Sequence, residues 1–467
     1  MNSKAIAAIA VIIIIIAAAG AYVALGGSGG DDGERTVGTY SAPECNLWIY
    51  GNANGDNYID QEDINLLEGI IAGTSEEVYV TVYDGYNASN DVARVSFADA
   101  NQDGRVDEAD VQKVRDIIAY QQAYSAAVSN GMLASFNDEI TLYYNNCDNI
   151  TASVHLPIKT LVSMYFSNSE IVRLLGAADR VVATDSTTVQ KPTLLPEFKD
   201  LPNLGDRKNT NSEAILATGA DAYFTGSAST YSPHLEEQIG EQVDIIRLSA
   251  WEDNNVMVGA LTLGYMLGAT EKAYEYIDWC FKYIDMVGEK VSGIADEDKV
   301  SVIVPKGRDS CLEGNGAGSG QYEITLLAGA DNLAYGMTAS SEYPDFTSED
   351  MLNRGVECII LSGYCGFEYT EADIQAKVLD VIDAAKQTYY GTPAVENGKV
   401  YFIANEIFTG PSNIVSMVYC AEWLYPELFP DLDGDAVFQE YIDLFCPSLA
   451  DYDLDAHIGQ FVYGPLV

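Results

Sequence analysis

Apolar residues follow a helical period through residues 251–294, the longest such pattern outside the N-terminal apolar run. Met257, Leu261 and Tyr265 are followed by further apolar side chains at three- and four-residue spacing up to Ile284. This spacing predicts a packed helix. The segment Gly-Ala-Thr at 268–270 is the one plausible break in it.

Short β-branched runs alternate with helical patterns on both sides of this helix. Such alternation predicts mainly parallel sheets, with ligand-binding loops at the carboxyl ends of the strands. A small hairpin is expected over residues 140–144 and 151–156. The expected strands are residues 160–164, 180–183, 222–225 and 244–248 before the helix, and 300–304, 358–361 and 399–403 after it.

The sequence before the helix is echoed after it. Residues 170–179 (EIVRLLGAAD) resemble 323–331 (EITLLAGAD), and 212–226 (SEAILATGADAYFTG) resemble 348–363 (SEDMLNRGVECIILSG), in the same order. The repeat predicts an α/β fold of two Rossmann-like lobes joined by a long helix, with a cleft between them. The expected bounds are 139–255 for the first lobe, 256–294 for the linking helix and 295–467 for the second lobe.

Charge and the N-terminus bear on location. A net charge of −46, from 70 acidic and 24 basic residues, argues against nucleic acid or anionic lipid as a binding surface. Residues 5–25 carry no charge, and about 21 residues span ~31 Å as a helix. With Lys4 before them, residues 1–25 predict a single-pass anchor with the body extracellular, and 26–44 a linker. A cleaved signal peptide is the alternative.

Two twelve-residue segments, 52–63 and 99–110, carry the oxygen pattern of a calcium loop. Calcium prefers six to eight oxygen ligands, and position 7 supplies only its carbonyl. The second loop has four carboxylates against three in the first, so we expect it to bind Ca²⁺ more tightly. Positions 1, 3, 5, 7, 9 and 12 are Asn52, Asn54, Asp56, Tyr58, Asp60 and Asp63 in the first loop, and Asp99, Asn101, Asp103, Arg105, Asp107 and Asp110 in the second.

Each loop runs into a matching helix and ends on Asp rather than Glu, and in this the pair resembles a dockerin. The resemblance implies a small all-α calcium-binding module over 45–125, followed by a linker over 126–138. It also implies calcium-dependent docking onto a cohesin-domain partner. The pair at positions 10 and 11 differs from the Ser/Thr pairs common in cellulosomal dockerins, and residues 74–96 form a longer spacer than usual.

The rest of the chain resembles the substrate-binding proteins of ABC importers for siderophores, haem and cobalamin. Four motifs carry the likeness, at residues 175–183 (LGAADRVVA), 211–216 (NSEAIL), 395–403 (VENGKVYFI) and 425–430 (YPELFP). The family implies two lobes that close only slightly on a metal chelate. It also implies that one surface glutamate of each lobe, here Glu213 and Glu349, docks onto an ABC permease. Both also follow a serine that is expected to cap a helix.

Candidate ligand contacts lie on loops that follow strands. Aromatic rings could cover the flat faces of a macrocycle or catecholate, and arginines could pair with anionic groups of a chelate. Core packing is the alternative for each aromatic residue. The candidates are Tyr165, Phe166, Tyr231, Trp251, Tyr364 and Phe408, with Arg207 and Arg308.

Other functions have less support. Three histidines far apart in sequence argue against free Zn²⁺ or Mn²⁺ as cargo, and no nucleophile with a base, Cys-His set or P-loop lysine indicates an enzyme. A cell-surface adhesion or scaffold component with an unused cleft is the alternative function. Eight cysteines in an exported chain suggest disulfides, but the spacing of the cysteines does not determine how they pair. Candidate pairs are 45–147, 311–365 and 420–446.

Overall fold

A four-stranded parallel sheet forms the core of the first lobe. The computed structural model describes residues 44–84, 92–250, 253–306, 311–335, 343–363 and 365–465. The strand order is β6-β5-β7-β8, and each strand is parallel to its neighbours. The strands are β5 (Leu161–Ser163), β6 (Val181–Thr184), β7 (Ala222–Thr225) and β8 (Asp244–Arg247). The helices are α3 (Phe166–Leu174), α4 (Ser186–Val189), α5 (Ser212–Thr218) and α6 (Leu235–Ile239).

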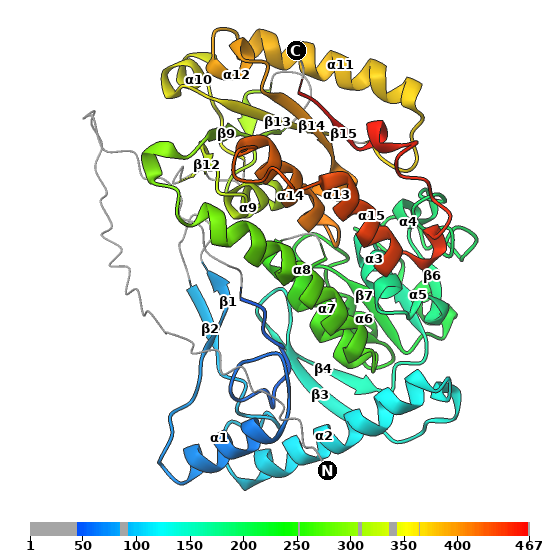
Figure 1. The fold of residues 1–467 in the computed structure, drawn as a ribbon. Coiled ribbons are helices and arrows are strands. Elements are labelled where there is room, and N and C mark those ends of the chain that lie inside the picture. The colour runs from blue at the N-terminus through cyan, green and yellow to red at the C-terminus, as the bar shows by residue number, and fades with distance from the viewer. Residues whose placement is uncertain are drawn as a thin grey trace, which may run out of the picture. The chain divides into compact units, whose positions relative to one another are not determined.

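The second lobe repeats this topology. Its sheet has the order β12-β9-β13-β14-β15, with β15 antiparallel at the edge. In both lobes the second strand lies on one side of the first strand and the third lies on the other. The strands are β9 (Ser301–Ile303), β12 (Asp331–Asn332), β13 (Cys358–Gly363), β14 (Val400–Ala404) and β15 (Val462–Tyr463). The predicted two-lobed α/β fold is therefore confirmed (Figure 1).

Helices and short elements complete the second lobe. The echoed sequence at 323–331 begins within α9, as 170–179 begins within α3, and the Ser-Glu repeats begin α10 and α5. The helices are α9 (Gly320–Leu327), α10 (Ser348–Arg354), α11 (Glu371–Thr388), α12 (Pro393–Glu396), α13 (Asn405–Phe408), α14 (Asn413–Leu424) and α15 (Gly434–Phe445). A short ribbon pairs β10 (Pro305–Lys306) with β11 (Glu313–Gly314).

The predicted linking helix is two helices, α7 (Asp253–Met266) and α8 (Thr270–Val291), which pack against each other. The chain breaks at the predicted place because Gly268 takes a φ of +64°, a conformation that glycine adopts without a Cβ penalty. Helix α8 contacts α3 of the first lobe and both α9 and α14 of the second. The Tyr276 hydroxyl on α8 donates to the Pro411 carbonyl at 2.8 Å. Helix α8 thus connects the lobes (Figure 1).

The two calcium-loop segments pack as part of the same body as the lobes. Helices α1 (Gln61–Ile71) and α2 (Glu108–Ser129) follow them, and an antiparallel ribbon of β1 (Val80–Asp84) and β2 (Val92–Val95) separates them. Helix α2 runs into the predicted linker 126–138. Its Gln121 amide donates to the Tyr265 carbonyl of α7 at 3.0 Å.

The chain just before the first loop adds a short strand-like segment to the hairpin of β3 (Ile140–Asn145) and β4 (Thr151–Leu156). The Tyr50 amide donates to the Tyr143 carbonyl at 2.9 Å, and the Asn145 amide donates to the Trp48 carbonyl at 3.0 Å. One continuous core therefore contains side chains from the calcium-loop segment, the hairpin, the helices α7 and α8 and both lobes.

Some predicted features lie outside the described residues, and others differ from the structure. No helix within the described ranges is long and apolar enough to cross a membrane. The predicted anchor, residues 1–25, lies outside those ranges, and so do residues 26–43 of the predicted linker. Cys45, Cys420 and Cys446 are free and buried, so the candidate pairs 45–147 and 420–446 are not formed. Cys446 instead accepts a hydrogen bond from Arg173 at 3.1 Å.

Candidate ligand-binding site

Four of the predicted ligand contacts form one cluster at the carboxyl ends of the first-lobe strands. Tyr165 directly precedes α3 and has a φ of +83°. Its ring centre lies 4.6 Å from that of Phe166 and 6.3 Å from that of Tyr231. The Arg207 guanidinium lies over both tyrosines, 4.3 Å from the Tyr165 ring and 5.4 Å from the Tyr231 ring. A cation that lies over aromatic rings can still offer the N–H groups of its edge to an anionic ligand.

Among the described residues Arg207 forms no ion pair, and its Nε is buried there without a hydrogen-bond partner. A buried donor without a partner costs about 1–3 kcal/mol, so ligand or water is the expected acceptor. In a chain of charge −46, this makes Arg207 the strongest candidate for binding a negative group.

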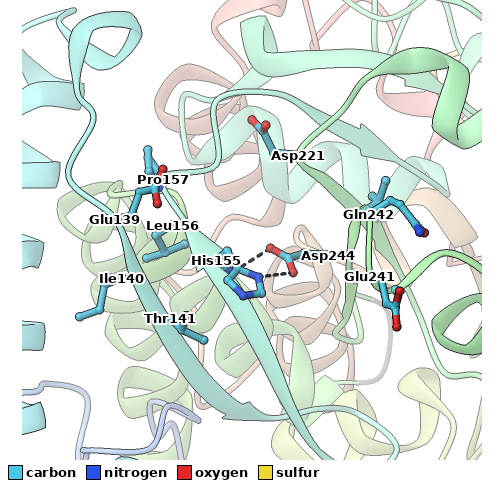
Figure 2. Close-up of a pocket in the computed structure, with 12 residues that line it drawn as sticks. Glu139, Ile140, Thr141, His155, Leu156, Pro157, Asp221, Glu241, Gln242 and Asp244 are labelled. Atoms are coloured by element: carbon cyan, nitrogen blue, oxygen red, sulfur yellow. Dashed lines mark hydrogen bonds and ion pairs between the residues drawn. The ribbon is translucent and has the colours of Figure 1, made fainter.

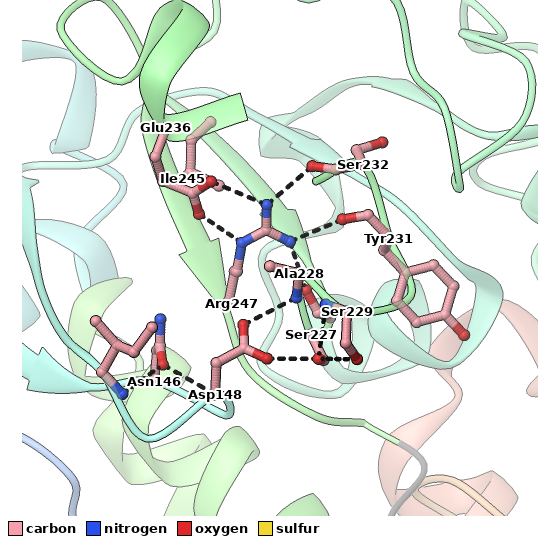
Figure 3. A network of polar contacts seen from close by, with 12 residues as sticks. Asn146, Asp148, Ser227, Ala228, Ser229, Tyr231, Ser232, Glu236, Ile245 and Arg247 are labelled. Atoms are coloured by element: carbon pink, nitrogen blue, oxygen red, sulfur yellow. Dashed lines mark hydrogen bonds and ion pairs between the residues drawn. The ribbon is translucent and has the colours of Figure 1, made fainter. Parts of the chain in front are cut away.

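The loop that carries Tyr231 is fixed from two sides (Figure 3). Arg247, 1% exposed at the end of β8, donates to the carbonyls of Gly226, Tyr231 and Ser232 at 2.8–3.0 Å. Its remaining donors bind the Glu236 carboxylate. Burial alone would raise the pKa of Glu236, but the hydrogen bonds and charge of Arg247, together with the Glu236 backbone amide and the charge of His234, lower it.

Asp148, in the turn of the β3–β4 hairpin, holds the other end of this loop. Its carboxylate accepts hydrogen bonds from the Ser227 hydroxyl at 2.5 Å and from the Ala228 amide at 2.8 Å. The sequence reasoning missed both Arg247 and Asp148. Arg247 could have been noticed in the sequence, because it ends a β-branched run in a chain with few basic residues.

Residues from both lobes meet beside the aromatic cluster. Lys191, which follows α4, forms an ion pair with Glu406 of α13, and its Nζ lies 4.5 Å from the Phe166 ring centre. A second contact joins the lobes where Glu368 accepts the amides of Thr193 at 2.8 Å and Leu194 at 3.1 Å. The carboxyl-end loops of the two sheets therefore touch.

Further polar atoms at this junction have no protein partner. Ser167 Oγ and Asn168 Oδ1, in the first turn of α3, and Asn405 Oδ1, at the start of α13, are buried without hydrogen bonds within the described part of the chain. A Cβ added to Gly410 would lie 3.3 Å from Ser167 Oγ, so the lobes approach closely here. Unpartnered buried polar groups of this kind call for water or ligand.

The remaining candidates fall elsewhere. Phe408 is fully buried in α13, as the packing alternative expects. Trp251, Arg308 and Tyr364 lie outside the described residues. Glu213 and Glu349 are both exposed in the first turns of α5 and α10.

The serine caps predicted for these two helices are wrong by one residue. The caps are Asn211, which accepts the Ala214 amide, and Thr347, which accepts the Asp350 amide. Each side chain reaches the amide three residues further on, which places Ser212 and Ser348 inside the helices rather than before them.

The two calcium-loop segments share one hydrogen-bond pattern. In the first, Asp63 accepts the amides of Asn54 at 3.1 Å and Asp60 at 2.8 Å; in the second, Asp110 accepts those of Asn101 at 3.1 Å and Asp107 at 2.9 Å. Both twelfth-position carboxylates are buried. Burial raises the pKa of Asp63 to about 7 and raises that of Asp110.

The residues of the two calcium-loop segments differ in how well they suit a bound cation. Asn52 Oδ1, at position 1, is buried without a hydrogen-bond partner in the described chain, as an oxygen reserved for a cation would be. Tyr58 and Arg105 are exposed, and only their carbonyls concern a cation. Within the described ranges no group of three or more His, Cys, Asp or Glu side chains is arranged to hold a metal ion.

A separate cavity of about 450 Å³ lies at the amino ends of β7 and β8 (Figure 2). Asp244 holds His155 there, with Nδ1 2.9 Å from Oδ1, and accepts the His155 amide at 2.8 Å. Asp221 accepts the amides of Lys159 and Thr160, both at 2.8 Å. These carboxylates already serve the local fold, and the cavity lies at the opposite strand ends from the aromatic cluster.

Two similar, mainly parallel sheets are joined by a connecting helix, and aromatic rings and Arg207 gather on carboxyl-end loops. These features are those of a two-lobed solute-binding protein. Comparison with known sequences agrees: the periplasmic binding protein family matches residues 161–407, more than half of the chain. The chain belongs to this family.

Individual relatives are distant. The chain is 23% identical over 279 residues to the uncharacterized ABC transporter substrate-binding lipoprotein YvrC of Bacillus subtilis, covering 58% of this chain and 82% of that protein. The TroA-like periplasmic binding protein FepB of Veillonella parvula has a TM-score of 0.52 at 19% identity, over 65% of this chain and 95% of that one. The molybdate-bound binding protein MolA of Haemophilus influenzae has a TM-score of 0.51 at 17% identity, over 65% and 97%. These structures share the fold.

Proposed function

We propose that the protein is the substrate-binding component of an ABC importer and captures an anionic metal chelate, of the ferric siderophore, haem or corrinoid type. The observation that carries this proposal is the Arg207 guanidinium lying over the rings of both Tyr165 and Tyr231. Flat aromatic faces suit a catecholate or a macrocycle, and a guanidinium with no ion-pair partner among the described residues suits its negative groups. The family, and a relative named as an ABC transporter substrate-binding protein, support the importer role.

The test is direct binding to the purified protein. Titration calorimetry with a ferric catecholate, a ferric hydroxamate, haem and cobalamin should show micromolar or tighter binding of one class. Arg207→Gln should weaken that binding by about tenfold to a hundredfold, because a charge-assisted hydrogen bond contributes about 1.5–3 kcal/mol. The exposed Lys208→Gln is the matched control and should bind as the unchanged protein does. Binding of no compound, or equal binding by Arg207→Gln, would refute the proposal.

Glu213 and Glu349 are proposed to contact arginines of the permease, because both are exposed at matching places of the two lobes. Charge reversal of both should abolish ligand-stimulated ATP hydrolysis by the reconstituted permease while chelate affinity stays unchanged. Reversal of the exposed Glu237 on α6 serves as the control. Unchanged stimulation would remove this assignment. We also propose that residues 1–25 attach the protein to the outer surface of the cell membrane.

A second proposed activity is calcium-dependent docking onto a cohesin-bearing partner through the dockerin-like segment. The shared hydrogen-bond pattern of the loops and the unpartnered Asn52 Oδ1 support two Ca²⁺ ions held by side-chain and carbonyl oxygens of 52–63 and 99–110. Calcium would neutralise the buried carboxylates and order the loops. Calorimetric calcium titration of Asp56→Asn and Asp103→Asn tests this: loss of the tighter phase only in Asp103→Asn is expected.

A partner-binding scaffold without transport is the competing function. It predicts cohesin binding in calcium without binding of any chelate, whereas the importer proposal predicts chelate binding with or without a cohesin.

A further inference from the structure

The ion pair between Lys191 and Glu406 connects the two lobes at the ligand-binding site. Lys191 belongs to the first lobe, in the turn after α4, and Glu406 belongs to the second, in α13, which follows β14. Both side chains are largely buried, 18% exposed for Lys191 and 5% for Glu406. A buried ion pair is weak evidence for stability but retains a strong electrostatic effect on its surroundings.

The carboxylate of Glu406 is fixed in place. Its Oε2 accepts the Phe367 amide at 2.9 Å, which leaves Oε1 toward Lys191. Gly366, with a φ of +125°, allows this approach, because a Cβ there would overlap Glu406 Oε2. Burial raises the pKa of Glu406, and the charge of Lys191 only partly offsets this rise. Of the two partners, Lys191 has the longer and more flexible side chain, so it is the one that can reorient.

Two cations therefore flank two adjacent aromatic rings. Arg207 lies 4.3 Å from the Tyr165 ring centre, Tyr165 and Phe166 are 4.6 Å apart, and Lys191 lies 4.5 Å from the Phe166 ring centre. The two differ in one respect: Lys191 has a carboxylate partner, whereas Arg207 has no ion-pair partner among the described residues. A ligand spanning both rings would meet one available positive charge and one that is already balanced.

We propose that Glu406 sets the charge selectivity of the site by competing with the ligand for Lys191, an inference that rests on the proposed capture of an anionic chelate. A ligand with one negative region binds Arg207 and leaves the Lys191–Glu406 pair intact. A ligand with further negative groups must either draw Lys191 away from Glu406 or lie close to a buried carboxylate. Glu406 is thus a specificity-determining residue that disfavours highly charged chelates.

The experiment compares a neutral ferric trihydroxamate with a trianionic ferric tris-catecholate by titration calorimetry. The measured quantity is the ratio of their dissociation constants. Glu406→Gln keeps the acceptor for the Phe367 amide but removes the charge, so it should shift the ratio toward the catecholate by about tenfold or more. Lys191→Met should shift it the other way, and Lys191→Arg should keep it within about twofold.

Glu368→Gln is the matched control, because Glu368 also joins the lobes but binds amides rather than a cation. It should leave the ratio unchanged. Thermal unfolding of each variant checks folding, and the ratio is unaffected by a uniform loss of active protein. A ratio in Glu406→Gln equal to that of the unchanged protein, or an equal shift in Glu368→Gln, overturns the selectivity role alone. If the unchanged protein binds neither these chelates nor haem nor cobalamin, the proposed function fails, and the selectivity role fails with it.

Discussion

Replacing Glu170 by glutamine should stabilise the protein at alkaline pH. Glu170 is 2% exposed on α3, and its Oε1 lies 3.6 Å from Arg173 Nη2. Its Oε2 is buried with no hydrogen-bond partner in the described chain. Two further carboxylates, Glu197 and Glu406, compete for the positive charges of Arg173 and Lys191. One proton on Glu170 balances these charges, and glutamine imitates that protonated form.

The magnitude follows from the pKa of Glu170, which burial raises from 4.5 to about 8 against the opposing effect of Arg173. Below pH 4.5 the carboxyl is protonated in both the folded and the unfolded chain, so it carries no penalty. As pH rises toward 8, the unfolded chain releases the proton and the folded chain retains it, so stability falls. At about 1.4 kcal/mol per pKa unit the full loss is roughly 5 kcal/mol. Relaxation of the cluster and entry of water should reduce the measured loss to about 2–4 kcal/mol.

The assay is urea unfolding of the unchanged protein and of Glu170→Gln from about pH 5 to about pH 9. The two should have similar free energies of unfolding at the acidic end and diverge in favour of the variant as pH rises. Glu237→Gln, on an exposed residue whose side chain is 80% accessible, controls for the loss of one surface charge.

The contrary result is a variant that is less stable than the unchanged protein at every pH above about 5. Glu170 would then be ionised and paired with Arg173 in the folded state, and the assignment of the proton to it would be wrong. Parallel curves with no divergence would show that the carboxyl titrates alike in the folded and unfolded chains.

Three further predictions concern other contacts. Gly366→Ala should lower the free energy of unfolding by about 3 kcal/mol in thermal unfolding, because the alanine must adopt a positive φ and its Cβ overlaps the Glu406 carboxylate. Gly293→Ala should lower it little. Asp148→Ala should weaken chelate binding by about threefold to tenfold without unfolding the protein, since it frees the loop that carries Tyr231; an unchanged affinity would deny its positioning role. Tyr274→Phe should lower calcium affinity about threefold at the first loop and leave the second unchanged, which paired calcium titrations would reveal.

Much of the fold could be predicted because the chain is internally repeated and its strands are buried on both faces. Runs such as 222–225 match β7 in full, and the break near Gly268 falls where the helical pattern lost its period. The echoed motifs lie at matching places in the two sheets, so repetition alone indicated two lobes. Ser212 and Ser348 were misassigned as caps because the preceding Asn211 and Thr347 are equally good capping residues.

The binding site could be predicted mainly where a residue lies on a loop that follows a strand. Tyr165, Phe166 and Tyr231 were identified on that basis, and Arg207 because a guanidinium can pair with the anionic groups of a chelate. The Lys191–Glu406 pair joins residues 215 positions apart in two lobes, and no periodicity reports such a contact. Phe408 shows the opposite error: its position after a strand suggested the site, but α13 turns it into the core.

The calcium-loop segment matters to anyone who would shorten this protein. Trp48 donates its amide to the Thr262 hydroxyl at 3.4 Å, and the Tyr274 hydroxyl on α8 donates to the Asn57 carbonyl at 2.9 Å. A chain begun at Glu139 would bare one edge of the β3–β4 hairpin, the part of α7 beside Trp48 and the turn at Gly268 beside Tyr124. Exposed apolar surface of this kind promotes aggregation, so such a shortened chain is expected to be poorly soluble. Residues 45–130 therefore belong with the lobes in expression and crystallisation, even where only ligand binding is of interest.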